Sequence, residues 1–171
     1  MPRSKILVVL LIAALMLQMF AMTSCVKDKG TEEPGNNAKP SILVSEASAS
    51  AGDTKVKVTV ALKNNPGVTS ILLKIVFDDK ALDLISVAYN SDIGGTCIPN
   101  ATTFSPVTVY WTDGFKNVTG DWTFATLIFN VADTAHSGDY KIDVIYNADD
   151  IYNAEETNVN FEVTAGKIIV S

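Results

Sequence analysis

From Ser41 to its last residue the sequence is a series of short segments in which apolar and polar residues alternate, and no helical period appears. A period of two places successive side chains on opposite faces of a strand. Val56–Lys63 shows it clearly, since its valines alternate with lysine and threonine. Gly, Asn, Asp and Pro residues separate the segments, which is typical of turns. The pattern predicts an all-β chain, an antiparallel β-sandwich with jelly-roll topology and eight or nine strands.

The segment Thr69–Phe77 is expected to be the central strand. One face carries an unbroken row of large apolar residues, which predicts contact with the core: Ile71, Leu73, Ile75 and Phe77. The other face mixes a hydroxyl, a cation and two aliphatic side chains: Ser70, Leu72, Lys74 and Val76. This mixture is typical of a surface that a partner covers part of the time, so we interpret it as the candidate binding face.

The N-terminal region has the pattern of a bacterial lipoprotein signal. Arg3 and Lys5 precede Ile6–Leu17, an apolar run of about twelve residues, which is too short for a membrane span. Small residues then lead to Cys25, and they resemble the site at which a cysteine is lipidated. We predict a signal peptide at residues 1–24, a lipid on Cys25, a flexible tether over residues 25–40 and a folded domain over 41–171. An ordinary secretory signal is the alternative.

Charge limits the possible binding partners, and the cysteine count limits the possible disulfides. Removal of residues 1–24 takes away Arg3 and Lys5 and changes the formal net charge from −6 to −8. So acidic a chain argues against binding to nucleic acid or to anionic lipid. With Cys25 lipidated, Cys97 is left without an intrachain disulfide partner and is predicted to be a free thiol in the loop 90–105.

No set of residues suggests catalysis or a metal centre. His136 is the single histidine and lies in a predicted turn, where a Ser-His-Asp triad could not be assembled. One histidine and one free cysteine are too few ligands for zinc. Asp78-Asp79 and Asp149-Asp150 could bind calcium, but paired aspartates at strand ends more often form turns. We therefore predict that the protein is not an enzyme and has neither cofactor nor metal.

Four sequence segments resemble the cohesin family, whose bacterial modules capture dockerins during assembly of cellulosomes and related surface complexes. They are Ala51-Gly52-Asp53 with the Val-x-Val-x-Val strand after it, IVFDDKALDL at 75–84, FATLIFNV at 124–131 and Gly138–Ile142. The resemblance covers nearly all of Ser41–Ser171. It implies a dockerin-containing partner that carries its own calcium. We expect the chain itself to be monomeric.

The resemblance also implies which strands form the dockerin-binding sheet. Val107–Asp113 and Phe124–Val131 would lie beside the central strand, with Trp111 in the core and the alternate residues outward. Tyr110 and Asp113 would lie near contact positions. The candidate partner-binding residues are Ser70, Leu72, Lys74, Val76, Tyr110, Thr112, Asp113, Thr126 and Ile128.

The leading hypothesis is a non-catalytic docking module, lipid-anchored outside the cytoplasm at a bacterial cell surface. A carbohydrate-binding lipoprotein with a related sandwich is one alternative, and a structural Ig-like spacer is another. Sugar stacking needs a row of exposed rings. Trp111 is predicted to be buried and Trp122 to cover a sheet end, so Tyr110 alone is a thin basis for a sugar site.

Overall fold

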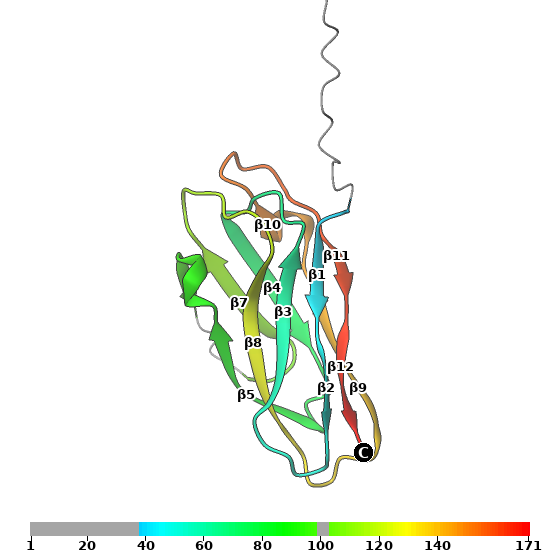
Figure 1. Ribbon diagram of the computed structural model, residues 1–171. Coiled ribbons are helices and arrows are strands. Elements are labelled where there is room, and N and C mark those ends of the chain that lie inside the picture. Colours follow the sequence, from blue (N-terminus) through cyan, green and yellow to red (C-terminus); the bar gives the residue numbers. More distant parts are fainter. Residues whose placement is uncertain (1–37, 99–102) are drawn as a thin grey trace, which may run out of the picture. The chain divides into compact units, whose positions relative to one another are not determined.

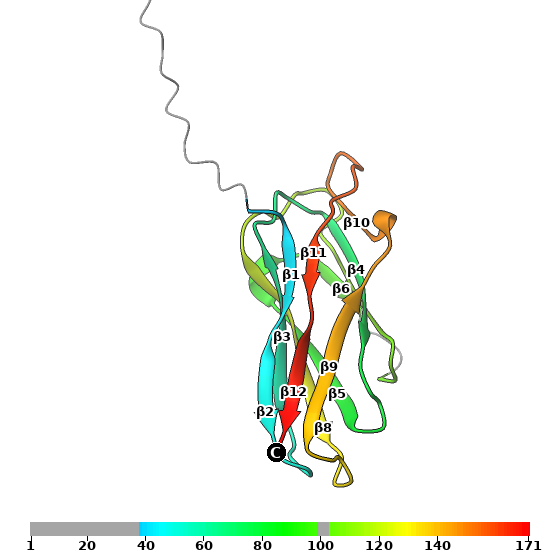
Figure 2. The same ribbon diagram turned by 90° about the vertical axis from the view of Figure 1, so that its right-hand side faces the viewer.

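Two β-sheets pack face to face in the computed structural model, which describes residues 38–98 and 103–171 (Figure 1 and Figure 2). The first sheet has the order β11–β1–β3–β8–β5, with bounds Glu162–Thr164, Ser41–Val44, Val56–Lys63, Trp122–Val131 and Leu82–Tyr89. The second has the order β2–β12–β9–β4–β7–β6, with bounds Glu46–Ala49, Gly166–Val170, Gly138–Ile145, Ser70–Val76, Val107–Thr112 and Thr96–Ile98. The short strand β10 (Ile151–Tyr152) pairs with β4, and two single-turn 3-10 helices complete the elements, η1 (Ser91–Ile93) and η2 (Ala148–Asp150). The predicted sandwich is confirmed.

The N-terminal segment, which forms β1 and β2, and the C-terminal segment, which forms β11 and β12, each cross from one sheet to the other. β1 runs parallel to β11 in the first sheet, and β2 runs parallel to β12 in the second. The stretch from Val159 to Val170 is therefore a single path that switches sheets near Ala165 (Figure 1). Its two strands pair with N-terminal strands, β11 with β1 and β12 with β2, and local patterning does not reveal this pairing.

The switch explains most of the difference in strand number. The described residues form twelve strands rather than eight or nine. The N-terminal segment is divided at its crossing point into β1 and β2, and the C-terminal segment into β11 and β12. In addition, the three-residue strand β6 lies within the segment predicted to be a loop.

Gly166 allows the two crossing paths to approach closely. A Cβ atom at this position would lie 2.2 Å from the carbonyl oxygen of Ser45 and 2.7 Å from that of Val44. Both atoms belong to the backbone, so neither moves aside at low cost. A side chain at residue 166 would force apart the strands that join the two sheets.

The inward-facing residues of both sheets form one core. Ile71, Leu73 and Ile75 of β4 have no exposed surface, as their alternation predicted, and neither has Trp111 of β7. Phe77, just past the end of β4, meets Phe129 of the other sheet edge to face, with ring centroids 5.1 Å apart. Each such buried side chain contributes roughly 1.5–3 kcal/mol to folding. The inner face of the second sheet is therefore packed against the first sheet, and its outer face is not part of this core.

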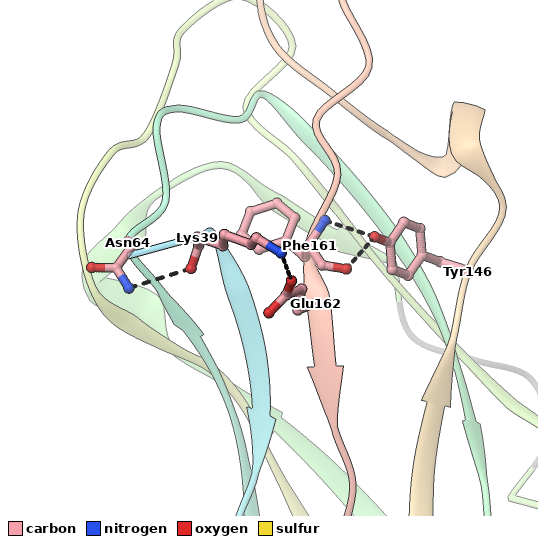
Figure 3. A network of polar contacts seen from close by, with 5 residues as sticks. All are labelled: Lys39, Asn64, Tyr146, Phe161 and Glu162. Carbon is pink, nitrogen blue, oxygen red and sulfur yellow. Dashed lines mark hydrogen bonds and ion pairs between the residues drawn. The ribbon is translucent and has the colours of Figure 1, made fainter. Parts of the chain in front are cut away.

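Polar contacts fix the backbone at the start of β1 and of β11 (Figure 3). The Lys39 ammonium group donates to the Glu162 carboxylate, which raises the pKa of Lys39. The Tyr146 hydroxyl accepts from the N–H of Phe161 and donates to its carbonyl oxygen, both at 2.7 Å. Tyr146 follows β9 and Phe161 precedes β11, so this pair of hydrogen bonds joins the two ends of the intervening segment.

The predicted signal peptide, the predicted lipidation site Cys25 and most of the predicted tether fall at residues 1–37, outside the described residues. Ala38–Ser171 forms one compact unit. Within residues 38–98 and 103–171, no helix has the length and apolar character needed to span a membrane.

Candidate binding face

The outer face of the second sheet contains most of the predicted binding residues. Leu72, Lys74 and Val76 of β4 are partly exposed, while the residues between them are buried. β7 pairs antiparallel with β4, so Leu72 lies opposite Tyr110. Tyr110 and Thr112 are partly exposed in the same alternation. The alternation in the sequence therefore correctly predicted which side chains of β4 from Leu72 onward and of β7 face outward.

The placement of Thr126 and Ile128 beside these residues was wrong. Their strand, β8, belongs to the other sheet and pairs with β3 and β5. Ile128 lies opposite Lys57 of β3, and Thr126 lies opposite Thr59. Alternation shows which residues of a strand face the core but not which sheet the strand joins. Both side chains thus face away from the sheet that carries Tyr110.

Two predicted residues lie at the end of the face. Ser70 is only 1% exposed, where β4 also pairs with β10, so it offers little surface to a partner. This corrects its assignment as a contact residue. Asp113 follows β7 directly and is partly exposed, and its N–H donates to the carbonyl oxygen of Thr69 at 2.9 Å.

Two exposed isoleucines on the same face were not predicted. Ile98 of β6 is 53% exposed and lies opposite Tyr110, and Ile145 of β9 is 49% exposed and lies opposite Lys74. For Ile145 the signal was available, because it shares one face with Lys141 and Asp143 and alternates with the buried Ile142 and Val144. For Ile98 it was not, because three residues are too few to show a period.

Four outward-facing apolar side chains on neighbouring strands are here called the apolar row and defined as Ile98, Tyr110, Leu72 and Ile145. The first three lie directly opposite one another on β6, β7 and β4, whereas Ile145 on β9 lies opposite Lys74, two residues along β4 from Leu72. Strands are spaced by about 4.8 Å, so the row spans roughly 14 Å. That length corresponds to between two and three turns of an α-helix laid across the strands.

Contacts of Trp111, Gly94 and Gly95 fix β6, the strand at one edge of the apolar row. The indole N–H of Trp111 donates to the carbonyl oxygen of Gly94 at 2.8 Å. Gly95 has φ +73°, and a Cβ there would lie 2.6 Å from the same indole nitrogen. Cys97 is partly buried on the inner side, and burial raises the pKa of its thiol. β6 is thus a short but fixed edge strand that presents Ile98 outward.

Two ion pairs of this face lie on β9 and between β9 and β12. Lys141 pairs with Asp143 at 2.6 Å on β9. Lys167 of β12 pairs with Asp139 at 2.7 Å, a contact that raises the pKa of Lys167. Lys74 of β4 is not part of the apolar row but lies opposite Ile145.

The aspartate pairs that could have bound calcium have structural roles. The Asp78 carboxylate accepts from the N–H of Lys80, and its backbone carbonyl oxygen accepts from the N–H groups of Ala81 and Leu82, as expected of a turn. Asp150 accepts from the N–H of Asn147 at 2.6 Å. In the described part of the chain, no group of three or more His, Cys, Asp or Glu side chains is arranged to hold a metal ion.

The tryptophans do not form an exposed platform. Trp111 is fully buried, and Trp122 packs against it with ring centroids 5.6 Å apart and against Phe124 at 6.0 Å. Trp122 therefore covers the end of the core. His136 is exposed in a turn, where its carbonyl oxygen accepts from Tyr140.

Comparison with solved structures identifies similar folds. CaCohA2 of Clostridium acetobutylicum, in complex with CaDoc0917, shares 23% identity with a TM-score of 0.69 and covers 78% of this chain and 100% of its own. The OlpA cohesin in a type I cohesin–dockerin complex from Clostridium thermocellum shares 19% identity over 78% of this chain and 100% of its own, with a TM-score of 0.67. A non-cellulosomal cohesin from the archaeon Archaeoglobus fulgidus shares 20% identity over 78% of this chain and 92% of its own, also with a TM-score of 0.67.

At these identities the likeness establishes the jelly-roll fold. A search of curated protein sequences finds no match. The profile of the family described as the cohesin domain, by contrast, matches residues 40–170, which is most of the sequence. The chain therefore belongs to the cohesin domain family.

Proposed function

We propose that this protein docks a dockerin-bearing partner through the outer face of the β9–β4–β7–β6 sheet. The observation that carries the proposal is the apolar row, with Ile98 and Ile145 about half exposed on a rigid sheet. Similar cohesin folds occur in complexes with dockerins, which supports the choice of partner.

The composition of the face suits protein docking. Interfaces derive most of their binding energy from a few central aromatic and aliphatic residues, surrounded by polar groups that contribute little. Tyr110 lies in the middle of the apolar row, between Leu72 and Ile98. The paired charges of Lys141 and Lys167 lie farther along the sheet and would form a polar rim.

In this proposal the protein is a binding module and catalyses no reaction. Calcium belongs to the dockerin, and this chain acts as a monomer without a cofactor. The glycan-binding alternative is weaker, because Trp111 is buried and Trp122 covers the core rather than forming a stacking platform.

We further propose that a lipid on Cys25 anchors the domain outside the cytoplasm at the cell surface. A single acyl chain gives only marginal attachment, whereas two or more hold a protein stably. A tether from residue 25 to residue 40 would extend roughly 20 Å as a random coil, or about 50 Å if fully stretched. The domain could then reach a partner a short distance from the membrane.

Titration calorimetry of the full chain against dockerin modules from the same organism, with calcium present, tests the proposal. We expect at least one module to bind at micromolar concentration or tighter, and cellulose and xylan oligosaccharides to give no heat. Sugar binding without binding of any dockerin module would instead favour the carbohydrate-binding alternative.

A further inference from the structure

The loop that joins β7 to β8, from Asp113 to Asp121, presents an aromatic side chain that the fold does not use. Phe115 is 95% exposed, the largest exposed fraction among the large apolar residues that the structure describes as exposed. The neighbouring Gly114, with φ +82°, lets the chain turn sharply into this position. An aromatic ring left so fully in water contributes nothing to the core, and aromatic side chains are enriched among the residues that dominate binding energy at interfaces.

The loop leaves β7 on the side of the apolar row. Thr112 follows the buried Trp111, so its side chain lies on the outer face. Its hydroxyl accepts from the N–H of Gly114 at 3.0 Å and donates to the carbonyl oxygen of Thr69 at 3.0 Å. The loop backbone just before Phe115 is therefore bonded to a side chain of the outer face.

The rest of the loop is held in place by neighbouring segments. Val68 and Val118 exchange two backbone hydrogen bonds, of 3.1 and 2.8 Å. The Asn117 side chain accepts from the N–H of Ala154 at 2.7 Å and donates to Glu155 at 3.2 Å. A side chain on a loop that is already ordered loses less conformational entropy on binding than one on a mobile loop.

The surroundings of the loop carry little net charge. A cleft of about 440 Å³ lies beside it, and the charged residues that line the cleft are Asp92, Asp113, Asp121 and Lys116. Asp121 forms an ion pair with Lys63 at 3.0 Å, and Lys116 offsets a second carboxylate. The apolar ring of Phe115 would therefore make the main contact with a partner at this loop.

We propose that Phe115 is a second anchor of the docking surface, which extends past the end of β7 and receives an apolar site on the same partner. The inference rests on the proposed function, because the partner is the dockerin module that covers the apolar row. Continuity supports it, since Asp113, the first residue of the loop, directly follows Thr112, the last residue of β7.

The test compares Phe115→Ala with the unmodified full chain in calorimetric titrations against the dockerin modules, with calcium present. We expect the dissociation constant to rise at least about tenfold, which corresponds to about 1.4 kcal/mol. Phe115→Leu should retain binding within about threefold, because an aliphatic side chain keeps most of the apolar contact. The melting temperature should not change in either variant, since the ring is exposed. Ile85→Ala, an exposed residue on β5 of the opposite sheet, is the control and should bind normally.

The outcomes separate this inference from the function on which it rests. If Tyr110→Ala weakens binding while Phe115→Ala binds as tightly as the unmodified protein, the second anchor is refuted and the docking face stands. If no dockerin module binds the unmodified chain, the proposed function fails and this inference fails with it.

Discussion

Replacement of Gly166 by alanine tests the sheet-switching arrangement on which the docking face depends. Gly166 does not have a positive φ, so alanine meets no conformational barrier there. At such a position Gly→Ala normally stabilises a protein by about 0.4–1 kcal/mol through the unfolded state. Any loss of stability must therefore come from the collision of the new methyl group with the carbonyl oxygens of Ser45 and Val44.

The expected magnitude follows from those two distances. At 2.2 and 2.7 Å the methyl carbon would lie well inside normal contact with both oxygens, so the paths β1–β2 and β11–β12 must separate. Overpacking of this kind costs roughly 1–3 kcal/mol. For a domain of this size each kcal/mol lowers the melting temperature by roughly 4 °C, so we expect a decrease of about 4–12 °C.

Thermal unfolding followed by circular dichroism measures this difference. Thr164→Ala, a change at an exposed position of the adjacent strand β11, is the matched control and should unfold within a few degrees of the unmodified protein. An equal or higher melting temperature for Gly166→Ala would show that the crossing strands are not as close as described.

Three further predictions concern the thiol, the anchor and calcium. Burial raises the pKa of Cys97, so the thiol is protonated at neutral pH. In the Cys25→Ala protein, alkylation of Cys97 by iodoacetamide should therefore stay slow up to a pH of about 8.5, and rapid labelling of the folded protein at pH 7 would contradict this. Cys25→Ala should also abolish metabolic palmitate labelling in the producing bacterium, and undiminished labelling would exclude Cys25 as the lipid site. Chelation of calcium should dissociate a dockerin complex while leaving the melting temperature of this protein unchanged, and a lowered melting temperature would place a calcium ion on this chain.

The fold could be predicted from the sequence because its main strands alternate strictly. In β4 and β7 every second residue is buried, so the row from Ile71 to Ile75 and the burial of Trp111 followed from the period alone. The free thiol of Cys97 was also expected, although β6 rather than a loop contains it.

The candidate site was predicted less completely, for reasons of topology. A period of two assigns faces within one strand, whereas the sheet to which a strand belongs is set by pairing between segments far apart in the chain. Thr126 and Ile128 were misplaced for that reason, as β8 inserts between β3 and β5. Ile98 was missed because its strand has three residues.

The most direct test of the docking face is the affinity of Tyr110→Ala for a dockerin module from the same organism, measured by titration calorimetry. Removing a ring at the centre of an interface costs roughly 2 kcal/mol or more, so the dissociation constant should rise about thirtyfold. Lys57→Ala and Ile128→Ala, which alter neighbouring residues of the opposite sheet, should bind like the unmodified protein. Unchanged affinity of Tyr110→Ala, together with weakened binding of Ile128→Ala, would contradict the account and move the docking surface to the other sheet.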